Sequence, residues 1–130
     1  MKTKFIYESI DDILKPKSEK DIEKELSKLS KHDLNYLLLD AAAENKTTNI
    51  ELIIKYGANV NCLTPGSIRD DRWTPLMYSS MNGNLESMII LIKYGANVNV
   101  KDVHGRTPLK LARSNGYIDA VNLLKQYGAK

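Results

Sequence analysis

The sequence contains few of the residues on which metal and nucleophile chemistry usually depends. Of its 130 residues, one is cysteine and two are histidine. A single cysteine, Cys62, excludes an intramolecular disulfide and a cysteine metal cluster. A zinc site needs several convergent ligands with recognisable spacing, and His32 and His104 have no such neighbours. We therefore expect no metal site and no cofactor.

Long apolar runs are also absent. The longest, residues 88–92, has five residues, whereas a membrane-spanning helix needs about 20. The first residues include lysines but reach Glu8, Asp11 and Asp12 before an apolar run develops, which is unlike a secretion signal. We expect a cytoplasmic protein that does not act at a membrane.

A strong excess of one charge is missing as well. The formal net charge is +3, with eight basic and eight acidic residues in 1–33 and eleven basic and eight acidic residues in 34–130. Proteins that bind nucleic acids usually carry a one-sided basic footprint. The sequence therefore does not favour a nucleic-acid partner.

An internal repeat dominates the rest of the sequence. The segment Lys-Tyr-Gly-Ala-Asn-Val-Asn at 55–61 recurs unchanged at 93–99, and a shortened copy stands at 126–129. Thr-Pro-Leu at 74–76 recurs at 107–109. The second and third units are offset by 33 residues and the first and second by 38, because five extra residues precede Thr74. Units of this length bury their apolar faces by stacking on one another.

The 33-residue period with Thr-Pro-Leu near its start resembles the ankyrin repeat, most closely at 102–112 and over about 36–130 in all. The departures are Lys110 and Met77 in place of the family's usual His, Arg72 in place of Gly, and Tyr-Leu-Leu at 36–38 in place of Thr-Pro-Leu. The resemblance implies an all-α fold, a solenoid of stacked helix pairs with projecting β-hairpin loops.

The repeated residues are suited to such helix pairs. Thr74 and Thr107 can cap a helix, and proline suits the position that follows a cap. Gly57, Gly95 and Gly128 can take the left-handed conformation that ends the second helix of each pair. We expect the buried stripe of the second helices to include Ile89, Leu91, Ile92, Val121 and Leu124.

The N-terminal segment lacks the repeat residues but has helical patterns. An apolar stripe at 5–14 stops at Pro16, and Ser18 with Asp21 and Ser30 with Asp33 resemble helix starts. We interpret helices at 5–14 and 18–29 as a cap for the solenoid; the alternative is an arm that docks on a partner. The expected units are a capping segment at 1–33 and repeats at 34–66, 67–101 and 102–130.

The resemblance also implies a protein-binding surface made of hairpin tips and the exposed face of each first helix. Ten positions follow from the resemblance, and Arg69 and Arg72 are added because they could pair with a partner's carboxylates; we name these twelve the binding strip. Ala43 and Glu44 of the first unit match the family less well. Trp73 could contact a partner or lie flat and shield a helix start, and Met81 could extend its apolar patch or fill the core. The binding strip comprises Arg69, Asp70, Asp71, Arg72, Trp73, Met81, Asn82, Val103, His104, Arg106, Ser114 and Asn115.

The long connection from Cys62 to Trp73 is peculiar to this chain. Its Pro65-Gly66 pair is a turn signal, and long connections in compact domains are often functional. We hypothesise that this loop contributes to the choice of partner.

The function that these patterns favour is a non-catalytic module, adaptor or inhibitor, that binds a partner protein of unknown identity. An effector that occludes a host or defence enzyme is the alternative. A small hydrolase or nucleotide-binding protein is disfavoured, since neither a Gly-rich phosphate loop nor a Cys–His pair within reach is recognisable. We expect a monomer, with self-association left open.

Overall fold

A computed structural model describes residues 18–64 and 72–130. Within these ranges the chain is helical, with seven helices and no strand. The helices are α3 (Glu19–Ser27), α4 (Lys31–Glu44), α5 (Thr47–Lys55), α6 (Pro75–Asn82), α7 (Leu85–Lys93), α8 (Pro108–Ser114) and α9 (Ile118–Gln126).

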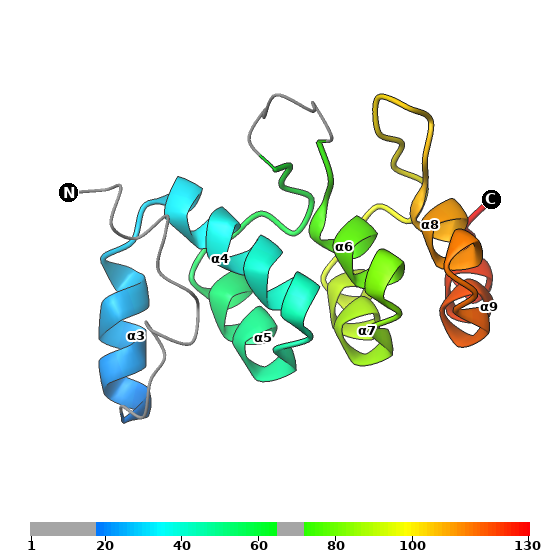
Figure 1. Cartoon of the computed structure of the whole chain (residues 1–130). Coiled ribbons are helices and arrows are strands. Elements are labelled where there is room, and N and C mark those ends of the chain that lie inside the picture. The colour runs from blue at the N-terminus through cyan, green and yellow to red at the C-terminus, as the bar shows by residue number, and fades with distance from the viewer. Residues whose placement is uncertain (1–17, 65–71) are drawn as a thin grey trace.

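The helices form three pairs that stand side by side in one row (Figure 1). Each pair contains a first helix (α4, α6 or α8) and a second helix (α5, α7 or α9), and first helices pack on first helices along the row. The loops that follow α5 and α7 leave the row at the same edge (Figure 1). This is the all-α solenoid that the repeat pattern implied.

The expected helix starts are confirmed. The hydroxyl oxygens of Thr74 and Thr107 accept hydrogen bonds from the backbone N–H groups of Met77 and Lys110, both at 3.2 Å. Pro75 and Pro108 follow directly, at positions whose N–H would have no partner in the helix. The repeated Thr-Pro therefore begins each first helix at the same point of its unit.

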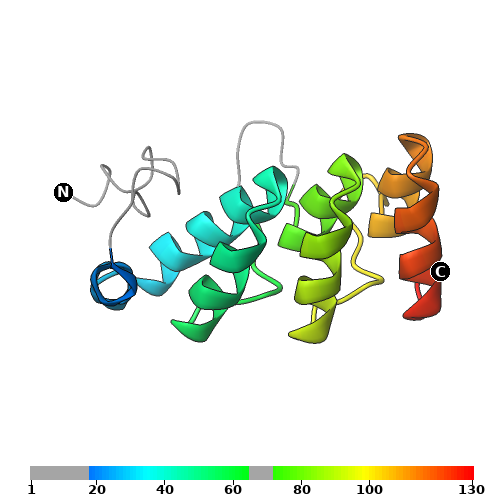
Figure 2. The same cartoon turned by 90° about the horizontal axis from the view of Figure 1, so that it is seen from below.

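At the N-terminal end, Ser18 and Ser30 cap α3 and α4 as expected, each accepting from the N–H group three residues on. The helix α3 is seen end-on in Figure 2, whereas the paired helices run across that view. Leu26 of α3 is fully buried in the same core cluster as the helix pairs. The helix expected at 5–14 lies outside the described residues.

One continuous apolar core runs through the helix pairs, and the prediction of its second-helix residues was partly wrong. Met88, Leu91 and Leu124 are fully buried, but Ile89 is 48% exposed. The buried face of α7 contains Met88 and Leu91. Ile89 directly follows Met88, so its side chain is rotated away from that face. A run of five consecutive apolar residues does not itself reveal which face is buried.

Polar side chains join one repeat to the next. Asn61 accepts from the backbone N–H of Asn97 at 2.8 Å and donates to the carbonyl of Gly95 at 3.2 Å. Asn99 makes the equivalent pair of bonds to Lys130 and Gly128. The recurrent asparagines therefore fix the spacing of neighbouring units through backbone groups that would otherwise lack partners.

The connections are loops that reverse the direction of the chain, and within 18–64 and 72–130 none of their residues is in a regular strand. The N–H of Asp102 donates to the carbonyl of Arg106 at 3.0 Å, and the N–H of Thr64 donates to that of Trp73 at 2.9 Å. A short loop base of this kind is too small for a regular ladder. The loops that follow α5 and α7 are called loop 1 and loop 2 below.

Candidate protein-binding surface

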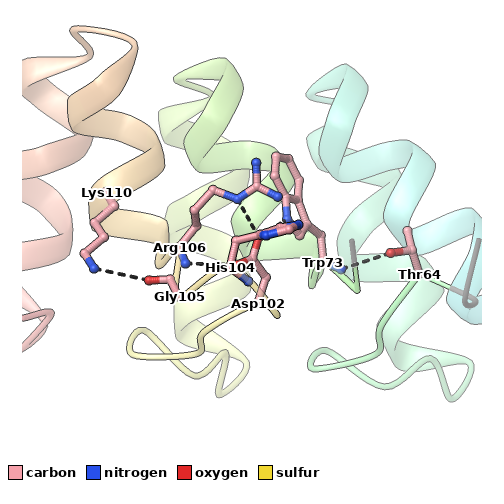
Figure 3. Close-up of polar contacts among 7 residues, drawn as sticks. All are labelled: Thr64, Trp73, Asp102, His104, Gly105, Arg106 and Lys110. Carbon is pink, nitrogen blue, oxygen red and sulfur yellow. Dashed lines mark hydrogen bonds and ion pairs between the residues drawn. The ribbon is translucent and has the colours of Figure 1, made fainter. Parts of the chain in front are cut away.

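Loop 2 is organised around the carboxylate of Asp102. Its Oδ1 accepts hydrogen bonds from the backbone N–H groups of His104 and Arg106, at 2.9 and 2.8 Å. Its Oδ2 accepts from Nε of Arg106 at 2.6 Å (Figure 3). Asp102 therefore holds both the backbone of the loop and the side chain of Arg106 in one arrangement.

The same carboxylate joins loop 2 to loop 1. The indole Nε1 of Trp73 donates to Oδ2 of Asp102 at 2.8 Å, and the guanidinium of Arg106 lies 5.1 Å from the centre of the Trp73 ring. Figure 3 shows the three side chains converging from the bases of the two loops. An Arg cation over an indole face is electrostatically favourable, so this triad couples the two loops.

The electrostatics of Asp102 reflect these contacts. Burial alone would raise the pKa of the carboxyl group, but hydrogen bonds from Trp73, Arg106 and His104 outweigh it and lower the pKa from 3.8 to about 2. Asp102 is therefore a carboxylate throughout the physiological range. The sequence signal that could have identified it is an Asp three residues before a Gly in a turn.

The structure favours the interpretation in which Trp73 lies flat and shields a helix start over the one in which it contacts a partner. The residue is only 7% exposed, and its ring packs edge-on against Tyr78 at 5.2 Å. Met81 is half-buried against the small cluster of Trp73, Met77 and Leu111. The apolar patch expected between Trp73 and Met81 thus exists, but it lies mainly inside the molecule.

Loop 1 has the same base as loop 2. Counted from the repeated segment, Thr64 stands where loop 2 has Asp102, and Trp73 stands where loop 2 has Arg106. The hydroxyl oxygen of Thr64 accepts from the N–H of Trp73 at 2.9 Å (Figure 3). The five extra residues are therefore inserted inside a loop whose base is unchanged. Arg69, Asp70 and Asp71 lie outside the described residues, and Arg72 is exposed.

The other positions of the binding strip lie at the tip of loop 2 and at the ends of the first helices α6 and α8. Val103, 59% exposed, and His104 stand at the tip of loop 2, while Ser114 and Asn115 are exposed at the end of α8. Asn82 is exposed at the end of α6, yet its amide also donates to the carbonyl of Ala43 at 3.1 Å. The structure thus gives Asn82 a contact between repeats in addition to its exposed position.

The charge of the side chains changes along the row of first helices. The end of α4 carries the half-buried Asp40 and the exposed Glu44, whereas α8 carries the exposed Lys110 and Arg113. Lys110 donates to the carbonyl of Gly105 at 3.2 Å and so extends from α8 toward loop 2. A partner that lies along the first helices would meet acids at one end and bases at the other.

Cys62, in the first part of loop 1, is buried, and burial raises the pKa of its thiol to about 12. The thiolate is the reactive form. We expect Cys62 to remain unmodified by Ellman's reagent at pH 8 in the folded protein and to react completely in urea, measured by absorbance at 412 nm. Rapid reaction of Cys62 without denaturant would contradict the expectation that its thiol is unreactive in the folded protein.

Within residues 18–64 and 72–130, no three His, Cys, Asp or Glu side chains gather into a set that could hold a metal ion. None of the helices in the same ranges combines the length and apolar character that crossing a bilayer requires.

Two comparisons with known proteins bear on this surface. A family model described as ankyrin repeats, in three copies, matches residues 38–130. A human protein, cyclin-dependent kinase 4 inhibitor B, is 31% identical over 75 residues, which are 58% of this chain and 51% of that protein. The chain thus spans about half the length of this curated relative. Neither comparison supports the alternative of an effector that occludes a host or defence enzyme. The residue boundaries expected for the capping segment and for each repeat remain predictions. The stacked helix pairs, the capped Thr-Pro starts and the family match together show that the chain belongs to the ankyrin-repeat family, whose repeats are protein–protein interaction modules.

Proposed function

We propose that this protein binds a partner protein through the tips of its loops and the exposed faces of its first helices. The observation that carries the proposal is the set of hydrogen bonds by which Asp102 holds the base of loop 2 while Val103 and His104 are exposed at the tip. A preorganised loop loses little conformational entropy when it binds. The chain contributes recognition rather than catalysis in this proposal.

The mode of action that we propose is occupation of a partner's surface. The matched human protein is by its name an inhibitor of a kinase. An inhibitor needs only a rigid surface that covers part of its target, and the row of helix pairs supports such a surface without chemical groups in a cleft. The identity of the target is not part of the proposal.

Site-specific photo-crosslinking tests the proposed surface. Benzoyl-phenylalanine placed at Val103 or His104 should crosslink one specific protein in an extract of the source organism, and excess unlabelled protein should compete. The matched controls are Asn122 and Lys125, which are exposed on α9. Mass spectrometry identifies the crosslinked protein. Equal crosslinking from α9, or none from loop 2, would contradict binding through the loop tips.

A further inference from the structure

A small pocket lies where α4, α6 and the base of loop 1 meet. Its volume is about 210 Å³. This is below the range of typical small-molecule sites, roughly 300–1,000 Å³, and it suits a single side chain. The lining residues are Tyr36, Leu39, Asp40, Ala43, Thr64 and Tyr78.

The walls of the pocket are held in place by the fold. Tyr36, Asp40 and Ala43 follow one another at spacings of four and three along α4 and therefore share one face of that helix. Tyr78 comes from α6 and is fixed by its edge-on contact with Trp73. Thr64 is held by the base of loop 1. The pocket is therefore formed before any partner arrives.

The chemistry of the pocket favours a cation. Among the residues that the structure describes, two phenol rings and one carboxylate line it, and no lysine or arginine does. Aromatic faces and carboxylates both attract positive charge, and Glu44 adds an exposed carboxylate one turn beyond Asp40. Asp40 already has an interaction within the chain. A carboxylate offers about four acceptor positions, so it can accept a second donor.

Another lined space of the surface has a different character. The space near Asn99 is lined by Lys101, Lys110 and Lys130 and by no acid. A basic side chain would be repelled there. The pocket beside Tyr36 is thus opposite in charge to the space near Asn99. A third space, lined by Tyr117 and Asp119, also combines an aromatic ring with a carboxylate, but it has one phenol ring where the pocket beside Tyr36 has two.

We propose that the pocket formed by Tyr36, Asp40 and Tyr78 receives an arginine side chain of the partner protein. A guanidinium can stack on a tyrosine ring while its N–H groups reach a carboxylate, which the compact ammonium of lysine does less well. This inference rests on the proposed function and adds the chemistry of one contact to it.

An NMR titration with a probe of known structure tests the pocket without the partner. The ¹⁵N-labelled protein is titrated with N-acetyl-arginine methylamide, and the amide signals of Tyr36, Asp40 and Thr64 are followed. The norleucine and glutamate analogues are the matched probes. We expect arginine to shift these signals in a saturable and salt-sensitive manner, with norleucine binding weaker and glutamate not binding.

Variants separate the role of charge from that of the fold. Asp40→Asn should weaken binding of the arginine probe by about three- to fivefold, the effect of one partly exposed ion pair, while the exposed Glu86→Gln on α7 should not change it. Tyr36→Leu, which keeps an apolar wall, should also weaken it. Equal binding of norleucine and arginine, or unchanged binding by Asp40→Asn, would overturn the proposal.

The crosslinking experiment at loop 2 distinguishes this failure from that of the proposed function. A specific partner crosslinked from Val103, together with no arginine binding, rejects the pocket alone. Binding of the arginine probe without any partner at loop 2 rejects the loop tips and retains the pocket.

Discussion

Asp102→Asn is expected to lower the free energy of unfolding at pH 7 by about 2–3 kcal/mol, the loss typical of hydrogen bonds to a buried charged group. In the folded protein, Oδ2 accepts from Trp73 at 2.8 Å and from Arg106 at 2.6 Å. The amide of asparagine can keep its oxygen toward the two backbone donors of loop 2. Its NH₂ group then faces the indole and guanidinium donors, and neither can be satisfied.

The pH dependence of this effect has a defined sign. The pKa of Asp102 is about 2 in the folded protein and about 3.9 in an unfolded chain. Because the folded pKa is lowered, the carboxylate stabilises the fold above the unfolded pKa, and this stabilisation is lost as the pH falls from about 5 to 2. The expected loss is about 2 kcal/mol. The difference between wild type and Asp102→Asn should therefore narrow below pH 4.

Urea unfolding at pH 7, 5 and 3 measures this difference. The fluorescence of Trp73, the single tryptophan, reports on the triad, and circular dichroism reports on the helices. Asp119→Asn is the control, since Asp119 is exposed on α9. A difference between wild type and Asp102→Asn that stays constant from pH 7 to pH 3 would show that the Asp102 charge is not what stabilises the two loops.

The repeat made most of the helical architecture predictable from sequence. Thr-Pro marks and terminal glycines locate helix ends through local backbone requirements, and those expectations are confirmed at Thr74, Thr107, Gly57 and Gly95. Burial within an apolar run depends on which neighbours the helix meets. The prediction was therefore wrong for Ile89, which is largely exposed.

The candidate site was less predictable because its residues interact across repeats. A lone tryptophan in a loop is compatible with an exposed contact, and only its partner, Asp102, 29 residues away in the sequence, shows where the ring lies. Thr64 aligns with Asp102 when both units are counted from the repeated segment, but a hydroxyl in place of a carboxylate gives no sign in the sequence that it holds the base of loop 1. Val103 and His104 are exposed at the tip of loop 2, and their contact with a partner stays a prediction.

The turn between α6 and α7 should be more sensitive to substitution than the equivalent turn of the next repeat. Gly83 and Gly116 both have positive φ, +67° and +76°. Alanine at either position has to adopt a left-handed backbone, which costs about 1–2 kcal/mol. The surroundings differ. A Cβ at Gly83 would lie 2.6–2.9 Å from the Tyr117 ring, whereas in the described part of the chain a Cβ at Gly116 meets nothing within 4 Å.

Gly83→Ala should therefore destabilise the protein by about 2–5 kcal/mol, and Gly116→Ala by only about 1–2 kcal/mol, since the crowding at Gly83 adds about 1–3 kcal/mol. The crowded atoms include Cγ of Tyr117, so the ring cannot escape by moving its far end alone. It must shift as a whole, together with the start of α9, where Tyr117 is the N-cap. Urea unfolding of the two variants measures the difference directly.

A double-mutant cycle separates the backbone cost from the crowding. Tyr117→Ala in the Gly83→Ala background should recover about 1–3 kcal/mol relative to the sum of the single substitutions, because the alanine Cβ then meets no ring. In the Gly116→Ala background the two effects should add. If Gly83→Ala and Gly116→Ala were equally destabilising and neither coupled to Tyr117, the close approach of α9 to the α6 turn would be refuted. Coupling confined to Gly83 would instead show that contact between consecutive repeats, and not the turn conformation alone, requires glycine there.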